Sequence, residues 1–89
     1  MNRRILFVDD DRNILRAYKR QYSTYFDMYT ALGAKEGFLA IKSEEPFAVI
    51  LSDMRMPEID GIQFLSRVKE FSPDSVRMML TGNATIWPS

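Results

Sequence analysis

Apolar side chains along this chain follow two periods that alternate from segment to segment. Two runs are continuously apolar over strand length and a third is apolar apart from Arg77, which is typical of β-strands covered on both faces of a sheet. A fourth segment contains Tyr29 and Thr30, residue types that favour strands. The predicted strands are residues 5–8, 26–31, 47–51 and 76–80.

The segments between these strands have apolar residues at helical spacing. Ile14, Leu15, Tyr18 and Tyr22 form one stripe within residues 12–23, and the basic side chains of that segment lie outside the stripe. Similar patterns predict helices over about residues 34–43 and 62–71. The order β-α-β-α-β-α-β predicts an α/β fold, a parallel sheet with helices on both faces.

Polar residues follow the predicted strands at the point where each strand ends. Asp9, Asp10 and Asp11 follow the first strand, Asp53 follows the third, and Thr81 follows the fourth. The carboxyl ends of parallel strands share one edge of the sheet, where ligands of such folds bind. Converging carboxylates favour a hard cation with oxygen ligands, and Mg²⁺ is the usual ion where phosphate chemistry follows.

Each of these acids also has a simpler structural interpretation when taken alone. Asp10 or Asp11 could cap the first helix, and Asp53 could simply begin a loop. Asp60, immediately before Gly61, is expected to cap the third helix whatever the function. It is the combination of acids after two buried strands with a hydroxyl after another that favours a functional site.

Composition excludes several classes of function. With 89 residues the chain forms at most one small domain, and 46% hydrophobic residues suffice for one core. Twelve basic and twelve acidic residues cancel, so neither nucleic acid nor a membrane is expected as a partner of this domain. The absence of Cys and His excludes disulfides, zinc fingers, thiol nucleophiles and His-based triads. The start of the chain lacks the pattern of a signal peptide, and a cytoplasmic location is expected.

Three motifs in order resemble the receiver domain of two-component response regulators. They are "ILFVDDD", "VILSDMRMPEIDG" and "RMMLTG", and the resemblance covers residues 3–82. It implies a flavodoxin-like fold and a phosphoacceptor protein that is not an enzyme in the usual sense. The partner would be a sensor histidine kinase or a phosphotransfer protein.

The resemblance also implies a role for each residue of the site. Asp53 would accept the phosphoryl group, while the Thr81 hydroxyl and the Gly82 backbone N–H would bind the phosphoryl oxygens. Asp11 has no such role and is expected to be a cap or a surface residue. The implied ligands of Mg²⁺ or Mn²⁺ are Asp9, Asp10, Asp53 and the backbone carbonyl of Arg55.

The pattern departs from the family after the fourth strand. Receiver domains have five strands and five helices, whereas this sequence predicts a receiver-like domain over residues 1–82 and a tail over residues 83–89. The tail is expected to be either non-native or the start of a fourth helix, and the chain is expected to be a truncated receiver with impaired phosphorylation. Its fourth strand would then be an open edge, so we expect self-association by strand pairing or by swapping of elements.

Two other functions account for part of the sequence. Asp9 and Asp11 have the spacing of nucleophile and acid in haloacid-dehalogenase-like phosphatases, but Asn13 stands where that family has Thr or Val. That interpretation also leaves Asp53 unexplained. The other alternative is a receiver-like interaction module that no longer signals.

Overall fold

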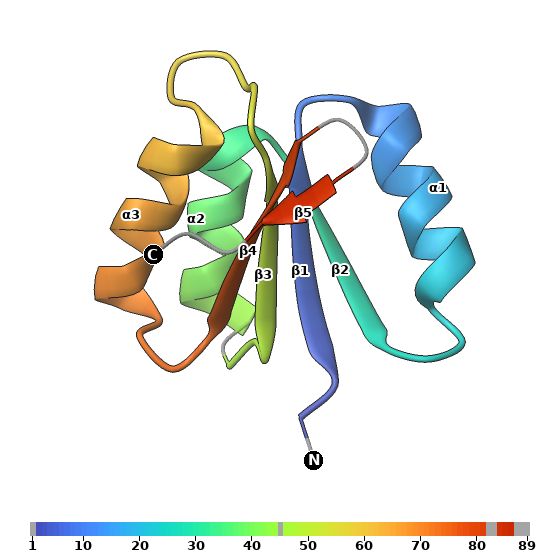
Figure 1. Ribbon diagram of the computed structural model, residues 1–89. Coiled ribbons are helices and arrows are strands. Elements are labelled where there is room, and N and C mark those ends of the chain that lie inside the picture. Colours follow the sequence, from blue (N-terminus) through green and yellow to red (C-terminus); the bar gives the residue numbers. More distant parts are fainter. Residues whose placement is uncertain (1, 45, 82–83, 87–89) are drawn as a thin grey trace.

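The computed structural model describes residues 2–44, 46–81 and 84–86, the last group and Thr81 by their backbone alone. Strands and helices alternate as the sequence predicts (Figure 1). The elements are β1 (Arg4–Asp9), α1 (Arg12–Tyr22), β2 (Asp27–Leu32), α2 (Gly33–Glu44), β3 (Val49–Asp53), α3 (Gly61–Phe71), β4 (Val76–Thr81) and β5 (Ala84–Ile86). In this described part, no helix has the length and apolar character needed to cross a bilayer.

The sheet has the strand order β2-β1-β3-β4-β5, and its first four strands are parallel. This confirms the predicted α/β class with a parallel sheet. β1 lies between β2 and β3, and Val8 of β1 pairs with Ser52 of β3. The residues that follow this pair, Asp9 and Asp53, therefore end neighbouring strands at the same edge.

The short strand β5 runs antiparallel to β4 and corrects two expectations. Residues 84–86 do not begin a helix, because they pair with the last three residues of β4. The β-branched Thr85 and Ile86 suit this extended pairing. The edge of β4 is consequently covered along its carboxyl half, while Val76, Arg77 and Met78 have no partner in β5. Residues 83 and 87–89 of the predicted tail lie outside the described residues, and their non-native origin stays a prediction.

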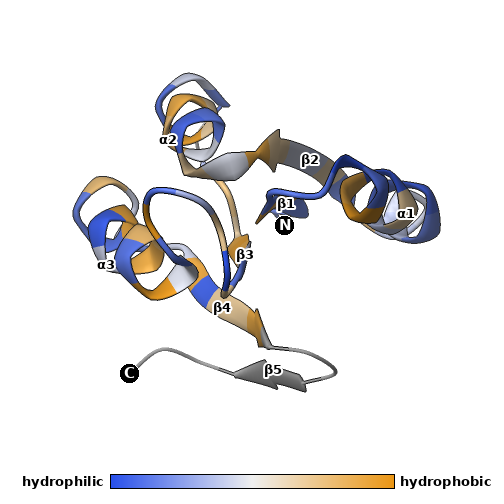
Figure 2. Ribbon diagram, turned by 90° about the horizontal axis from the view of Figure 1, so that it is seen from above, coloured by the Kyte–Doolittle hydropathy of each residue, from blue (hydrophilic) through white to orange (hydrophobic). Residues whose placement is uncertain are grey.

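Alternate residues of the strands divide the sheet into two faces, which Figure 2 shows edge on. We call the face under α2 and α3 the packed face. Its strand residues are fully or almost fully buried: Leu6, Val8, Ile50 and Met79. Gly37 of α2 lets this helix approach closely, since a Cβ atom there would lie 2.8 Å from the ring of Phe64 in α3.

We call the opposite face, which carries α1, the open face. Its strand residues include Ile5, Phe7, Val49, Leu51 and Leu80. α1 contacts β1 and β2 in the described structure, and neither β3 nor β4 lies beneath it (Figure 2).

The apolar stripe of α1 is narrower than predicted. Leu15 is buried, and Tyr18 packs edge-on against Phe7 with ring centroids 4.7 Å apart. Ile14, which was expected in the stripe, is 39% exposed and does not belong to the buried cluster of this face. Leu15 is thus the one fully buried residue of α1, and the partly buried Tyr18 and Tyr22 pack beside it.

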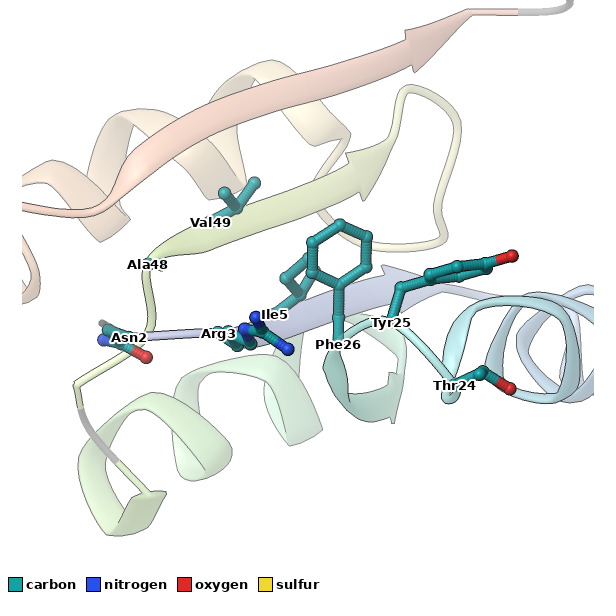
Figure 3. Close-up of a pocket in the computed structure, with 8 residues that line it drawn as sticks. All are labelled: Asn2, Arg3, Ile5, Thr24, Tyr25, Phe26, Ala48 and Val49. Atoms are coloured by element: carbon teal, nitrogen blue, oxygen red, sulfur yellow. The ribbon is translucent and has the colours of Figure 1, made fainter.

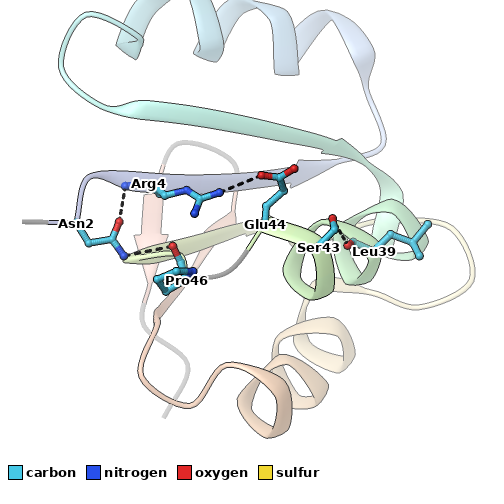
Figure 4. Close-up of polar contacts among 6 residues, drawn as sticks. All are labelled: Asn2, Arg4, Leu39, Ser43, Glu44 and Pro46. Carbon is cyan, nitrogen blue, oxygen red and sulfur yellow. Dashed lines mark hydrogen bonds and ion pairs between the residues drawn. The ribbon is translucent and has the colours of Figure 1, made fainter.

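The amino end of the sheet is tied together by Arg4 (Figure 4). Its guanidinium bonds the Glu44 carboxylate at 3.1 Å and lies over the rings of Tyr29 and Phe47. The Asn2 side-chain amide donates to the backbone carbonyl of Pro46 at 3.3 Å. These contacts stabilise the fold at the amino end of the sheet.

Candidate functional site

Three carboxylates meet where β1 and β3 end. Asp9 and Asp53 are the last residues of the two neighbouring parallel strands, and Asp10 follows Asp9 directly. One oxygen atom from each of the three side chains lies within 4.8 Å of the others. The structure thus confirms that these acids share one edge of the sheet and one small volume.

Asp9 is the most deeply placed of the three acids. Its side chain is only 3% exposed, and its Oδ1 accepts a hydrogen bond from the backbone N–H of Asp11 at 2.9 Å. Burial raises the pKa of Asp9 from 3.8 to about 6, and the Asp11 N–H offsets this in part. The negative charges of Asp53 and Asp10 add to the rise in pKa.

Asp53 is half-buried and lies in a more mixed field. Burial is the largest cause that raises its pKa, and the charge of Asp10 raises it further. The backbone N–H groups of Arg55 and Met54, together with the Arg55 charge, lower the pKa. The net result is a pKa of Asp53 above its ordinary value of 3.8.

This donor set fits a hard divalent cation. Three carboxylate oxygens within reach of one ion are the ligand type that Mg²⁺ and Mn²⁺ prefer. A bound dication would also relieve the mutual repulsion of the acids, which adds to the effect of burial on the pKa of Asp9. The acids at the end of the apolar strands therefore make physical sense as partners of an ion.

The loop after β3 is folded tightly against the backbone of Asp53. The Gly61 N–H donates to the Met54 carbonyl at 2.8 Å, and a Cβ atom at Gly61 would lie 2.3 Å from the Asp53 carbonyl oxygen. The buried Ser52 hydroxyl donates to that same carbonyl at 2.9 Å. These contacts hold Asp53 in place at the end of its strand.

Sequence reasoning overlooked these two supporting residues. The Asp-Gly pair before a helix marked Gly61 as a boundary but did not reveal its contact with Asp53. For Ser52 the signal was a single hydroxyl residue that interrupts an apolar run just before an acid. Only the structure connects either residue with the position of the carboxylate.

Asp11 and Asp60 are helix caps, as predicted. The Asp11 side chain accepts hydrogen bonds from the N–H groups of Asn13 and Ile14 at 2.8 and 3.4 Å and caps α1. Asp60 forms a reciprocal capping box with Gln63 at the start of α3. Neither acid belongs to the cluster of three.

The other predicted site residues are placed less completely. Thr81 ends β4, one residue beyond the Leu80 that pairs with Asp53, but its side chain and Gly82 lie outside the described part of the chain. Arg55 is exposed on the loop two residues after Asp53. The roles assigned to these three residues stay predictions.

The fold and the acids together define a class of protein: an α/β domain with a carboxylate site at the carboxyl edge of a parallel sheet. A sequence model of the response regulator receiver domain matches residues 5–87, nearly the whole chain. The chain belongs to this family, the receiver domains of two-component systems.

Individual relatives agree with this assignment. The hydrogenase transcriptional regulatory protein HoxA of Cupriavidus necator is 36% identical over 78 residues, which cover 88% of this chain and 16% of HoxA. A crystal structure described as an adenylate cyclase from Rhodopirellula baltica has a TM-score of 0.89 at 43% identity, covering 93% of this chain and 62% of that one. The response regulator TrrA of Thermotoga maritima, crystallised with Mg²⁺-BeF, has a TM-score of 0.75 at 26% identity, covering 86% and 66% of the two chains.

This chain spans less than two thirds of the R. baltica chain and a small part of HoxA. The similarity therefore concerns the receiver domain, and the activities of the longer proteins do not transfer with it.

Proposed function

We propose that this receiver domain accepts a phosphoryl group on Asp53 from the phosphohistidine of a sensor histidine kinase or a phosphotransfer protein. The observation that supports the proposal is the meeting of three carboxylates within 4.8 Å where two neighbouring parallel strands end. We assign the acceptor role to Asp53 because its motif resembles the phosphoacceptor strand of the family and because its half-buried carboxylate is held by its own loop. Asp9 is too deeply buried to meet a protein donor.

The transfer is a displacement at phosphorus. A carboxylate oxygen of Asp53 forms the new P–O bond while the P–N bond to the donor histidine breaks, and the electron pair returns to the imidazole nitrogen. Such reactions depend on alignment and on neutralisation of charge more than on a strong nucleophile. We assign the binding of the phosphoryl oxygens to the Thr81 hydroxyl and the Gly82 N–H.

The reaction requires a divalent cation on this proposal. Asp9, Asp10, Asp53 and the Arg55 backbone carbonyl would hold Mg²⁺ or Mn²⁺, which supplies positive charge to the acceptor and to the phosphoryl oxygens. The carboxylate donor set supports this choice, as does the Mg²⁺-BeF complex of the related TrrA.

The domain acts as a phosphoacceptor and not as an enzyme with its own substrate turnover. We place it in the cytoplasm, where the kinase would obtain ATP, and assign it no nucleic-acid or membrane partner of its own. We also propose that copies of the chain self-associate. Only part of the β4 edge is open for strand pairing between copies, because β5 pairs with the carboxyl half of β4.

Intact-mass spectrometry tests the phosphoacceptor function directly. The chain is treated with a small acyl phosphate and Mg²⁺, and we expect the mass to rise by one phosphoryl group, at low yield if the site is impaired. Asp53→Asn should abolish the gain. Asp60→Asn is the matched control on the same loop, and it should keep the gain because Asn caps helices as well as Asp does.

Two failures of this experiment have different meanings. No mass gain in a folded chain that also ignores Mg²⁺ would favour the non-signalling interaction module. A gain that persists in Asp53→Asn would move the acceptor to another acid.

The phosphatase alternative finds no support in the structure. It needs Asp11 as a free general acid, whereas the Asp11 carboxylate caps α1 through two backbone N–H groups. It also assigns no role to Asp53, which lies beside Asp9.

A further inference from the structure

Helix α1 carries a concentration of positive charge, although the whole chain has equal numbers of basic and acidic residues. No residue of α1 is acidic, and four of its eleven residues are cationic and exposed: Arg12, Arg16, Lys19 and Arg20. Arg12, Arg16 and Lys19 lie on one side of the helix because they are four and three residues apart, and Arg20 is adjacent to them. We call these four residues the basic face.

The basic face borders a hollow of about 260 Å³ beside the edge strand β2. Its lining residues from α1 and β2 are Arg12, Leu15, Arg16, Lys19, Thr30 and Leu32. Glu36 adds one acid from the first turn of α2, which lies on the other side of β2 from α1 (Figure 2). Because β2 is at the opposite end of the strand order from β4 and β5, this hollow is separate from the uncovered surface over β3 and β4.

Charge distinguishes this hollow from the one at the amino end of the sheet (Figure 3). There Arg3 is the one charged side chain among the described lining residues, and the apolar lining does not favour one kind of occupant over another. In the hollow beside β2, three cations of one helix converge. This hollow therefore has a defined chemical preference, which is for negative charge.

The stability of α1 does not account for the basic face. Lys19 and Arg20 lie in the last turn, where a cation is favourable beside the helix dipole. Arg12 is the first residue of the helix, where a cation is unfavourable, and Arg16 repels both Arg12 and Arg20 because like charges four residues apart are neighbours. In the described part of the chain none of these four side chains forms an ion pair. Their charge is therefore available to a binding partner.

We propose that the basic face binds an acidic segment of a partner protein. Guanidinium groups form paired, charge-assisted hydrogen bonds with carboxylates. From Arg12 to Lys19 the helix rises by about 10 Å, a length that about three residues of an extended peptide span. Leu15 and Leu32 line the same hollow and offer apolar contact to side chains between the acids of the peptide.

A short acidic segment fits this surface better than a nucleic acid or an anionic membrane. The acids of the candidate site lie at the amino end of α1, since Asp9 and Asp10 directly precede its cap, Asp11. Their negative charge repels a polyanion that extends past the helix. A helix that binds a membrane buries its apolar side in the lipid, whereas Leu15 and Tyr18 of α1 pack on the sheet.

Fluorescence anisotropy of the whole chain with a labelled peptide that contains a run of Glu residues tests the proposal. We expect saturable binding that weakens as salt is added, and no binding of the same peptide with Gln in place of Glu. Arg12→Gln and Arg16→Gln should each raise the dissociation constant by about threefold, and the double variant should raise it by about tenfold. Arg67→Gln is the matched control and should leave the dissociation constant unchanged, because Arg67 is an exposed helical cation that lies on α3.

Glu36→Gln should change binding in the opposite direction. The Glu36 carboxylate accepts a hydrogen bond from the backbone N–H of Leu32 at 3.2 Å, and Gln retains an oxygen for this bond. Because the variant removes the acid of the hollow, it should lower the dissociation constant by about twofold. Arg12→Gln should not lower the melting temperature of the free chain, because it removes a cation from the start of the helix. Circular dichroism of every variant checks that the fold is retained.

Three results would overturn the proposal. The first is no binding of the Glu peptide at low salt. The second is equal weakening by Arg16→Gln and Arg67→Gln, which would reflect net charge alone. The third is binding of an RNA oligonucleotide or of vesicles with anionic lipid that depends on Arg16 and is tighter than binding of the peptide, which would assign the basic face to another class of partner. Asp53→Asn should still bind the peptide, so this test and that of phosphorylation succeed or fail separately.

Discussion

The two faces of the sheet come from the same strands, yet they differ in how they are covered. On the packed face, Leu6, Val8 and Ile50 are wholly buried beneath α2 and α3. On the open face, Val49 and Leu51, which flank Ile50 in β3, are half-buried and line a groove. Almost identical apolar residues therefore have two different environments.

This difference determines how much each face contributes to the stability of the fold. Because the free energy of burial scales with the apolar area removed from water, the packed face contributes more to folding per residue. The open face contributes less per residue, because its strand side chains Val49 and Leu51 stay partly in water. Its alternation also ends in Asp9 and Asp53, so the acid site belongs to the open side of the molecule.

The largest contrast is expected between two adjacent residues of β3. Ile50→Ala leaves a cavity in the packed face and should lower the free energy of unfolding by about 2–5 kcal/mol. Leu51→Ala on the open face should cost less than about half of that, because its side chain is already partly in water. Urea unfolding at low protein concentration measures both. Equal losses would show that the two faces are equally covered in solution.

Gly37→Ala tests the close approach of helices on the packed face. The added Cβ would lie 2.8 and 2.9 Å from two atoms of the Phe64 ring and 3.1 Å from Val8. We expect a loss of about 1–3 kcal/mol from overpacking, which outweighs the better helix propensity of Ala. Ser43→Ala, exposed at the end of the same helix, should change stability by less than about 0.5 kcal/mol. A Gly37→Ala variant more stable than wild type would contradict the tight packing.

Asp9 makes the stability of the folded chain dependent on pH. Burial raises its pKa from 3.8 to about 6, so between these values the folded chain keeps a proton that the unfolded chain has released. The contribution of Asp9 to stability is therefore complete below about pH 4 and is lost as the pH rises through about 6. In the absence of divalent ions, Asp9→Asn should be more stable than wild type by about 1–2 kcal/mol at about pH 8. This difference is smaller than the full pKa shift implies, because nearby solvent screens the charge of Asp9.

Urea unfolding at about pH 5 and about pH 8 checks this prediction, because the advantage of Asp9→Asn should shrink at the lower pH. Asp27→Asn at the start of β2 is the control, and its effect should stay within about 0.5 kcal/mol. Added Mg²⁺ should stabilise wild type and do little for Asp9→Asn. A pH-independent difference between the two chains would disprove the role of burial.

The smallest effect is expected at the cap of α1. Asp11→Ala removes the acceptor for the Asn13 and Ile14 N–H groups and should cost about 1 kcal/mol. Hydrogen exchange should show faster opening of α1 than of α3, since one residue of α1 is fully buried whereas four residues of α3 are buried. Uniform exchange across both helices would remove the distinction between the faces.

Much of the fold could be predicted because its signals are local. The apolar runs of β1, β3 and β4 and the helical spacing of α3 lie within single segments, and each formed the predicted element. Ile14 shows the limit of this reasoning. Its place on the apolar stripe was visible, but its exposure depends on how α1 is rotated against β1.

The three acids of the candidate site could be predicted from the sequence, but the contacts that support them could not. Asp9, Asp10 and Asp53 could be paired because parallel strands bring their carboxyl ends to one edge. The supporting contacts of Ser52 and Gly61 could not, because they depend on the path of a loop in space.

The sequence by itself determined the order of strands and helices and the acids at the strand ends, because periodicity and turn residues act over a few neighbours. The tertiary structure decided that α1 leaves β3 and β4 uncovered, that residues 84–86 return antiparallel along β4, and that Asp9 is buried deeply enough to shift its pKa. These outcomes depend on the free energy of contacts between residues far apart in the chain, which no short stretch of sequence contains.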